Sequence, residues 1–235
     1  MNVLAKDQIT AALARIPAKQ AIEAMAHAFA AHSRGDSRVP PVAHMSFSAP
    51  PGDVHVKCGY ICGDPVFVVK IASGFYDNPK HGLKASSGMM VVCSATTGVP
   101  QTILYDEAYL TDYRTAAAGA LVAQLLAPSN ISAIGIVGTG VQAHLQLDLL
   151  RHVTDCRRAY VWGRDAKKAR AFSVDGFEIG ACVNVADVAS RCNLIVTTTA
   201  ATKPLLCAND VRPGTHVTAI GADMPGKQEL DPAIF

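Results

Sequence analysis

Charged side chains are scarce in this chain of 235 residues: Asp, Glu, Lys and Arg make up only 17% of it, whereas 50% is hydrophobic. Disordered chains have the reverse balance, so the composition excludes a disordered protein and indicates a packed core. The formal net charge of +2 is spread without a run of Lys or Arg. The charge pattern therefore favours neither nucleic acid nor a membrane surface as a partner.

Long apolar runs and targeting segments are also missing. No uninterrupted apolar stretch reaches the roughly 18 residues of a membrane span, and the first twenty residues do not resemble a signal peptide. The seven cysteines are scattered, and Cys58 and Cys62 form a C-x3-C pair that no second pair or nearby His completes. We therefore expect a cytoplasmic protein with reduced thiols and no metal site.

The sequence pattern of the first half of the chain is typical of an α+β domain. Helical periodicity predicts helices over residues 18–33 and 110–127, with Gly35 ending the first and Thr111 or Asp112 capping the second. Between residues 38 and 101, clustered prolines and short β-rich runs separated by turns predict a mainly antiparallel or mixed sheet.

The second half alternates strands and helices from residue 132 onwards, which predicts a parallel sheet with helical crossovers. Its third strand is expected around residues 183–185. The predicted fold class is therefore α/β, with an N-terminal α+β domain over residues 1–129 and a Rossmann domain over residues 130–235.

The most specific local signal is a glycine turn. An apolar strand runs into Gly138-Thr139-Gly140-Val141-Gln142-Ala143, a G-x-G-x-x-A string, and a helix follows. Gly138 permits a tight turn, Gly140 allows a pyrophosphate to approach the backbone, and the helix N-terminus faces the phosphates. The motif alone is weak evidence, but the strand before it, the helix after it and the further alternation of strands and helices together indicate dinucleotide binding.

The end of the second strand of this domain bears on the choice of cofactor. Gly163 stands where an acidic residue usually holds the ribose of NAD, and Arg164 follows directly. This pattern favours NADP(H), because an Arg can hold the 2′-phosphate. Asp165, one residue further, keeps NAD(H) open, and a solvated surface role for Arg164 is the alternative.

Three charged residues stand in apolar or small-residue surroundings. Asp223 follows the buried-looking strand that ends at Gly221, Lys70 lies inside an apolar strand, and Arg114 begins the helix over residues 110–127. A carboxylate can exchange protons with an amine, and the two cations can grip a carboxylate. Each has a structural alternative: a turn cap for Asp223, an exposed edge lysine, and a surface salt bridge.

Three segments together resemble the ornithine cyclodeaminase/mu-crystallin family. They are the glycine turn over 138–143, Leu110-Thr111-x-x-Arg114-Thr115-Ala116-Ala117, and the segment over 221–230 with Gly221-Ala222-Asp223-x-Pro225-Gly226-Lys227-x-Glu229-Leu230. The resemblance runs from about Arg38 to the end of the chain. It implies a homodimer in which a substrate and dimerisation domain packs on a Rossmann domain, with the active site between them. It also implies an NAD(P)-dependent enzyme that acts on the Cα–N bond of an amino acid or of its imine.

The resemblance also implies roles for individual residues. Asp223 and Lys70 would be catalytic, and the substrate-binding set would be Arg38, His55, Lys57, Lys70 and Arg114. The cofactor-binding set would be Thr115, Gly138, Thr139, Gly140, Val141, Gln142, Arg164, Asp165, Thr199, Gly221, Ala222 and Lys227. His55 and Lys57 depart from the apolar and acidic side chains expected of an ornithine-binding enzyme. A basic pair there suits a substrate with an additional carboxylate.

Two other functions stay open. One is a mu-crystallin-like protein that binds the nucleotide and a small ligand without catalysis, although the joint presence of Asp223, Lys70 and Arg114 favours an enzyme. The other is an inactive, shortened member of the family. The chain stops at Phe235, soon after the Asp223 segment, whereas family chains continue, so we expect a Rossmann sheet that is incomplete at its C-terminal side.

Overall fold

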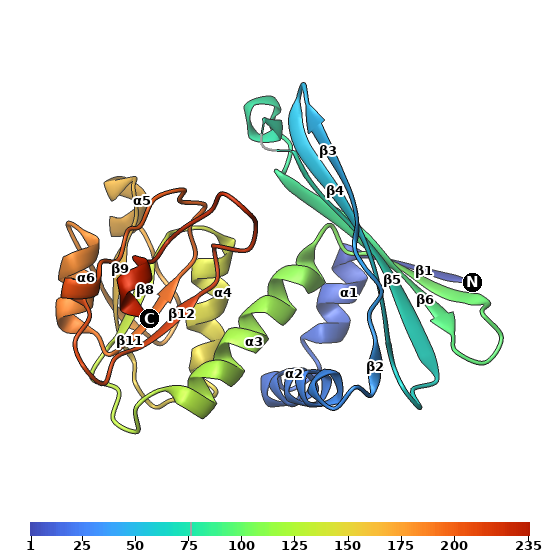
Figure 1. Cartoon of the computed structure of the whole chain (residues 1–235), viewed down its shortest axis with the longest axis horizontal. Helices are drawn as coiled ribbons and strands as arrows, with labels where there is room; N and C mark the ends of the chain where they lie inside the picture. Colours follow the sequence, from blue (N-terminus) through green and yellow to red (C-terminus); the bar gives the residue numbers. More distant parts are fainter. Residues whose placement is uncertain (76) are drawn as a thin grey trace. The chain divides into compact units, whose positions relative to one another are not determined.

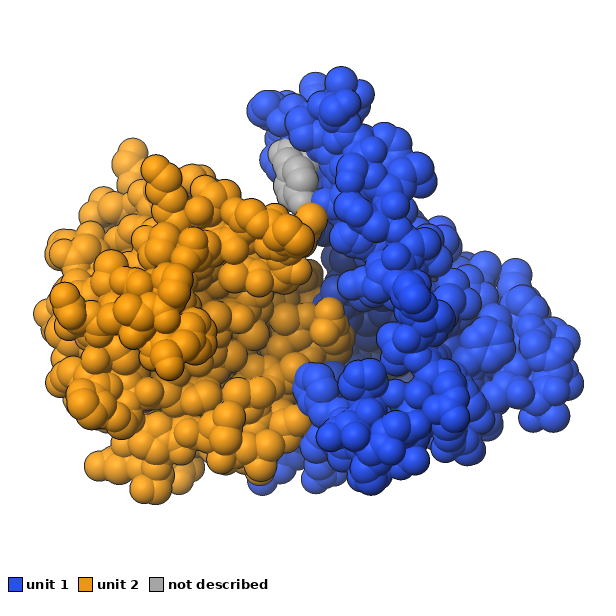
Figure 2. Space-filling view, viewed as in Figure 1, with its two compact units in different colours: residues 1–111 blue, residues 112–235 orange. Residues whose placement is uncertain are grey.

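The computed structural model describes residues 1–75 and 77–235, and they form two compact units, residues 1–111 and 112–235 (Figures 1 and 2). We placed the boundary later, between residues 129 and 130. The difference is helix α3 (Tyr109–Leu126), most of which belongs to the second unit. The Nε2 of Gln146 on the following helix donates to the carbonyl oxygen of Thr115 at 3.2 Å, so α3 packs as part of that unit.

The first unit contains a seven-stranded sheet among its described residues, which confirms the predicted mixed sheet. The strands follow the order β1-β7-β6-β5-β4-β2, and β3 also pairs with β4. All the pairs are antiparallel except β1 with β7. The strands are β1 (Asn2–Ala5), β2 (Ser37–Arg38), β3 (Ala43–Ser48), β4 (Pro51–Ile61), β5 (Val66–Phe75), β6 (Ser86–Ser94) and β7 (Pro100–Tyr105).

Helices α1 (Lys6–Leu13) and α2 (Ala18–Ser33) lie on one side of this sheet, as Figure 1 shows. They bury Ile9 and Ile22 respectively. The predicted bounds of α2 are confirmed, and Gly35, with φ of +78°, follows its last residues as expected of a helix-ending glycine. A short 3₁₀ helix, η1 (Asn78–His81), precedes β6.

Helix α3 begins earlier than predicted. We expected Thr111 or Asp112 to cap it, but the helix starts at Tyr109. The buried carboxylate of Asp106 accepts a hydrogen bond from the Leu110 backbone N–H at 2.8 Å and so occupies the capping role. Asp106 lies outside the apolar periodicity of the helix, and the sequence pattern alone therefore did not identify it.

The second unit is built on a parallel sheet in the order β10-β9-β8-β11-β12, which confirms the predicted Rossmann-type arrangement. Its strands are β8 (Ile134–Val137), β9 (Arg158–Trp162), β10 (Glu178–Ala181), β11 (Leu194–Thr197) and β12 (His216–Ala219). Its helices are α4 (Val141–Leu150), α5 (Ala166–Arg170) and α6 (Val185–Arg191), with 3₁₀ turns η2 (Ala208–Asp210) and η3 (Pro232–Ile234).

The third strand of this sheet is not where we predicted it. Strand β10 covers Glu178–Ala181, whereas residues 183–185 lead into α6. Val183 is exposed, and the side chain of Asn184 caps the helix by accepting from the Asp187 N–H at 2.7 Å. The capping bond explains why a β-like triplet ends outside the sheet.

Helices cover both faces of the parallel sheet, and α4 and α6 lie on opposite sides of it (Figure 1). Alternate residues of β8 divide between the two layers: Ile136 packs with Leu147 of α4, whereas Val137 packs with Val188 of α6. Burial of both faces accounts for the continuous apolar strands of this half of the chain. Among the described residues, no helix is long and apolar enough to cross a membrane.

Candidate active site

The glycine turn between β8 and α4 forms an open approach to the helix N-terminus. Gly138 has φ of +129°, a conformation that only glycine adopts readily, and a Cβ there would collide with Oγ1 of Thr198. Gly140 differs, because a Cβ added to it would meet no heavy atom within 4 Å. The turn therefore needs glycine at 138 for the backbone itself, whereas glycine at 140 leaves free space in front of the helix.

A cavity of about 290 Å³ lies beside this turn. It is lined by residues that follow three neighbouring strands: Gly138, Thr139, Trp162, Gly163, Arg164, Thr198, Thr199, Ala200, Ala201 and Leu205. These positions are the carboxyl ends of β8, β9 and β11, where open α/β sheets bind ligands. The chain order reverses between β8 and β11, so the cavity lies at the topological switch point. The free space, the glycine turn and the helix N-terminus together fit a dinucleotide pyrophosphate.

The end of β9 packs closely on the glycine turn. A Cβ at Gly163 would lie 2.6 Å from Cγ2 of Thr139, so a side chain at this position would require the Thr139 side chain to shift. The carboxylate of Asp165 is engaged locally, since it caps α5 by accepting from the N–H groups of Lys167 and Lys168 at 2.9 and 3.3 Å. Arg164 is exposed at the cavity and makes no hydrogen bond or ion pair within the described part of the chain.

Other residues of the expected cofactor set connect α3 to α4. The Nε2 of Gln142 donates to the carbonyl oxygen and to Oδ1 of Asp112, at 3.1 and 3.2 Å. The Gln142 side chain therefore joins the two helices. Of Gln142, the group that faces a ligand at the α4 N-terminus would be the backbone N–H. Val141 is 61% exposed at the same helix start, unusually open for a valine.

Asp223 and Lys227 form an ion pair on the segment that follows β12. The Nζ of Lys227 lies 2.7 Å from Oδ1 of Asp223, and their side chains are 23% and 62% exposed respectively. The exposed carboxylate is accessible to a ligand, while the ammonium group fixes one of its oxygens. We predicted different roles for these two residues, and the structure joins them.

Glu229 is a residue to which sequence reasoning gave no role. Its side chain is fully buried and accepts four hydrogen bonds, from the N–H and Oγ1 of Thr199, from Oγ1 of Thr197 and from the N–H of Gly221. Thr199 and Gly221, both expected to bind the cofactor, are thereby held by one carboxylate. Only its place in the segment over residues 221–230 could have drawn attention to Glu229.

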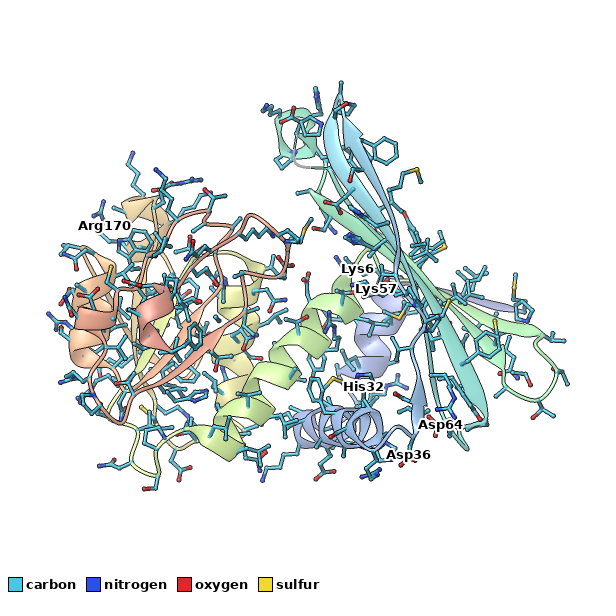
Figure 3. The ribbon with its side chains drawn as sticks, in the orientation of Figure 1. Lys6, His32, Asp36, Lys57, Asp64 and Arg170 are labelled. Atoms are coloured by element: carbon cyan, nitrogen blue, oxygen red, sulfur yellow. The ribbon has the colours of Figure 1, made fainter. Side chains whose placement is uncertain are left out.

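The first unit gathers basic side chains on one face of its sheet. Lys57 of β4, labelled in Figure 3, is directly opposite Lys70 of β5, and His55 is directly opposite His44 of β3. Directly paired residues and residues two apart share a face, so all four project from the same side. The His44 and His55 rings are 4.5 Å apart, and Nζ of Lys70 lies 3.4 Å from Oγ1 of Thr111.

Burial and the neighbouring charges both act on His55. Desolvation, followed by the positive charge of Lys57, lowers the pKa of His55, and Asp53 opposes the shift. The protonated form of the His55 ring is therefore disfavoured. His44 was not among the predicted residues, and its pairing across the strands identifies it as a fourth member of the basic face.

Arg38 does not join this group. Its guanidinium donates to the carbonyl oxygens of Gly35 and Ser37 at 2.9 and 3.0 Å, and its strand partner is Tyr60. Arg114 belongs to the second unit, where desolvation lowers the pKa of its guanidinium and Asp112 acts in the opposite direction. Within the described residues, no group of three or more His, Cys, Asp or Glu side chains could hold a metal ion.

Comparison with known proteins places these features in a family context. The chain is 44% identical over 201 residues to an uncharacterized cyclodeaminase of Sinorhizobium fredii, covering 83% of this chain and 61% of that protein. An archaeal alanine dehydrogenase dimer with bound NAD matches with a TM-score of 0.90 and 32% identity, over 100% of this chain and 71% of that one. The iminosuccinate reductase of Paracoccus denitrificans, in complex with NAD⁺, matches with a TM-score of 0.85 and 26% identity, over 100% and 72% of the two chains.

The chain spans about two thirds of the length of its curated relatives, between 61% and 67% for the first three. Residues 5–235 match the family model described as ornithine cyclodeaminase/mu-crystallin family. The glycine turn, the Asp223 segment and the shared fold agree with that match along the whole chain, and the protein is therefore a member of the ornithine cyclodeaminase/mu-crystallin family.

Proposed function

We propose that this protein is an NAD(P)-dependent oxidoreductase acting on the Cα–N bond of an amino acid or of its imine. The observation that carries the proposal lies within one unit. A glycine turn with free space in front of a helix stands at a cavity on the sheet edge, and the accessible Asp223 carboxylate follows β12 of the same sheet. The cyclodeaminase, dehydrogenase and reductase among the related proteins support this reaction class.

The residues of the chain supply binding and proton transfer. When bound, the nicotinamide supplies the hydride chemistry. Lys70 and Arg114 bind the substrate carboxylate and fix the orientation of Cα. Asp223 exchanges a proton with the substrate nitrogen or with attacking water. Before the substrate binds, the ammonium group of Lys227 donates a hydrogen bond to one oxygen of this carboxylate, Oδ1.

We further propose a dicarboxylic substrate. Like charges directly opposite on neighbouring strands destabilise a sheet, yet Lys57 is paired with Lys70, with His44 and His55 on the same face. A second carboxylate on the substrate would offset this repulsion by binding between the cations. An ornithine side chain would bring a further ammonium group and increase it.

The substrate proposal is tested with a panel of imines. Imine reduction is followed by NADPH absorbance with oxaloacetate plus ammonia, pyruvate plus ammonia and a cyclic ketimine. Cyclisation of ornithine leaves the cofactor in its starting oxidation state, so it is followed by the release of ammonia with oxidised cofactor present. Replacement of Lys57 by Met should lower kcat/KM for the dicarboxylic imine by about tenfold to a hundredfold, because a charge-assisted contact is lost, and should leave the KM for NADPH unchanged. The matched control is Lys19→Met, at an exposed lysine of α2. Ornithine as the only substrate turned over would contradict the proposal.

For the cofactor we propose NADP(H). The Asp165 carboxylate caps α5, Gly163 offers no carboxylate and packs against Thr139, and Arg164 is accessible. Arg164→Ala should therefore reduce the preference for NADPH over NADH, measured as the ratio of the two dissociation constants. A wild-type protein that binds NADH more tightly than NADPH would refute this assignment.

We also propose a homodimer formed through the sheet of the first unit. The face opposite to Lys57 carries apolar side chains that are open to solvent, including Val3, Met45 and Ile71 at 60%, 56% and 37% exposure. Large apolar side chains exposed on one face of a sheet are typical of a subunit interface. Light scattering should give the mass of a dimer, and Met45→Glu should shift it towards the monomer.

A further inference from the structure

Glu229 is a buried carboxyl group that is held by hydrogen bonds alone among the described residues. Its side chain has no exposed surface, and in the described part of the chain no Lys, Arg or His pairs with it. Oε1 accepts from the N–H of Thr199 at 2.5 Å and from its hydroxyl at 2.7 Å. Oε2 accepts from the N–H of Gly221 at 2.7 Å and from the hydroxyl of Thr197 at 2.8 Å. Burial of a carboxylate requires such complete pairing.

These four bonds connect two segments that leave neighbouring parallel strands. Thr197 and Thr199 are at the end of β11, and Gly221 follows β12. The fit between the segments is close, because a Cβ at Gly221 would lie 2.6 Å from the Thr199 nitrogen and 2.8 Å from Cδ of Glu229. The carboxylate therefore links the two segments to each other.

Both connected segments are parts of the proposed site. Thr199 lines the cavity at the switch point, and Gly221 precedes Asp223 by two residues. In a doubly wound sheet, the adenosine half of a dinucleotide lies on the side of the first and second strands, and the nicotinamide half lies across the switch point. Strands β11 and β12 are on the nicotinamide side.

We infer that Glu229 is the positioning residue of the nicotinamide half of the site: it fixes the cavity wall at Thr199 and the base of the Asp223 segment in one arrangement. This inference rests on the proposed function. It assigns Glu229 no contact with the substrate or the cofactor. Its effect passes through the two backbone N–H groups that it binds.

Glu229→Gln tests the inference with little change in volume. The amide offers one oxygen and one NH₂ group, so one of the two backbone N–H groups must face another donor. The threonine hydroxyls can rotate to accept, but the N–H of Thr199 or of Gly221 cannot. Calorimetry with NADPH and with 2′,5′-ADP, which reproduces only the adenosine half, should show NADPH binding weakened about tenfold and 2′,5′-ADP binding unchanged.

The matched control is Glu178→Gln, the same chemical change at an exposed position of β10, which should alter neither affinity. Equal weakening of NADPH and 2′,5′-ADP by Glu229→Gln would overturn the inference, since it would show a general effect on the unit. Unchanged binding of both would overturn it as well. If the wild-type protein binds neither NADPH nor NADH, the proposed function itself fails, and the two failures are thereby distinguished.

A second variant serves if Glu229→Gln does not fold. Thr197→Val removes one of the four bonds at a fully buried residue that does not line the cavity. NADPH binding should then weaken about threefold, again with no change for 2′,5′-ADP. An unchanged NADPH affinity in a folded Thr197→Val protein would refute the role of the network.

Discussion

Gly140→Ala should separate cofactor binding from folding. The position has φ of −87° and ψ of −170°, which any residue adopts, and a Cβ there would meet no heavy atom within 4 Å. The methyl group would instead occupy the space in front of the α4 N-terminus that the proposed pyrophosphate needs. We therefore expect a stable protein that binds the dinucleotide poorly.

The magnitude follows from ligand linkage. At a free cofactor concentration of about 100 times the dissociation constant, binding stabilises the wild-type protein by about 2.7 kcal/mol. If the methyl group raises the dissociation constant about a hundredfold, the same concentration contributes only about 0.4 kcal/mol. At about 2–4 °C per kcal/mol for a chain of this size, the ligand-induced rise in Tm should fall from about 5–10 °C to about 1 °C.

The assay is thermal unfolding with and without NADPH, and Gly221→Ala provides the contrast. At Gly221 the methyl group would overlap the backbone of Thr199, so the ligand-free protein should lose about 1–3 kcal/mol of unfolding free energy. Ligand-free Gly140→Ala should stay within about 0.5 kcal/mol of the wild-type value. A full NADPH-induced shift in Gly140→Ala, or a large loss of stability without ligand, would refute the reasoning.

Three further outcomes are expected. Gly119→Ala should destabilise the protein by about 1–3 kcal/mol, measured by urea unfolding, because the added Cβ would collide with the Gln146 amide, and an unchanged midpoint would contradict this packing. The exposed thiol of Cys62 should react rapidly with a disulfide reagent at pH 8, whereas Cys192, whose pKa burial raises to about 12, should react only after unfolding. Because the folded-state pKa of His55 lies below 6.5, stability should fall as pH decreases from 6.5 through that lower pKa, and His55→Gln should flatten this dependence; an equally steep fall in the variant would exclude His55 as its source.

The features predicted correctly from the sequence are those set by neighbours along the chain. The glycine turn at Gly138, helix α2 with Gly35 after it, and the alternation of strands and helices all depend on local backbone preference and apolar periodicity. Family membership, inferred from three short segments, is also confirmed.

The features that the sequence left unresolved arise from contacts between distant segments. β10 takes its position from pairing with β9, and the β-like residues around Val183 are left outside the sheet. The start of α3 depends on the buried Asp106, which precedes the apolar pattern of the helix. Glu229 is similar: its role needs three segments that meet only in the folded chain. The roles predicted for Asp223, Lys70 and the remaining site residues stay predictions until the variants are measured.

The parallel pairing of β1 with β7 has a consequence for how the protein is made. Asn2 is aligned with Thr102, so β1 leaves the ribosome about a hundred residues before its hydrogen-bonding partner. Until β7 has been synthesised, the edge of β6 that β7 will occupy remains unpaired, and such edges promote association with other chains. Completion of the first sheet during translation must therefore wait for the segment that leads directly into α3.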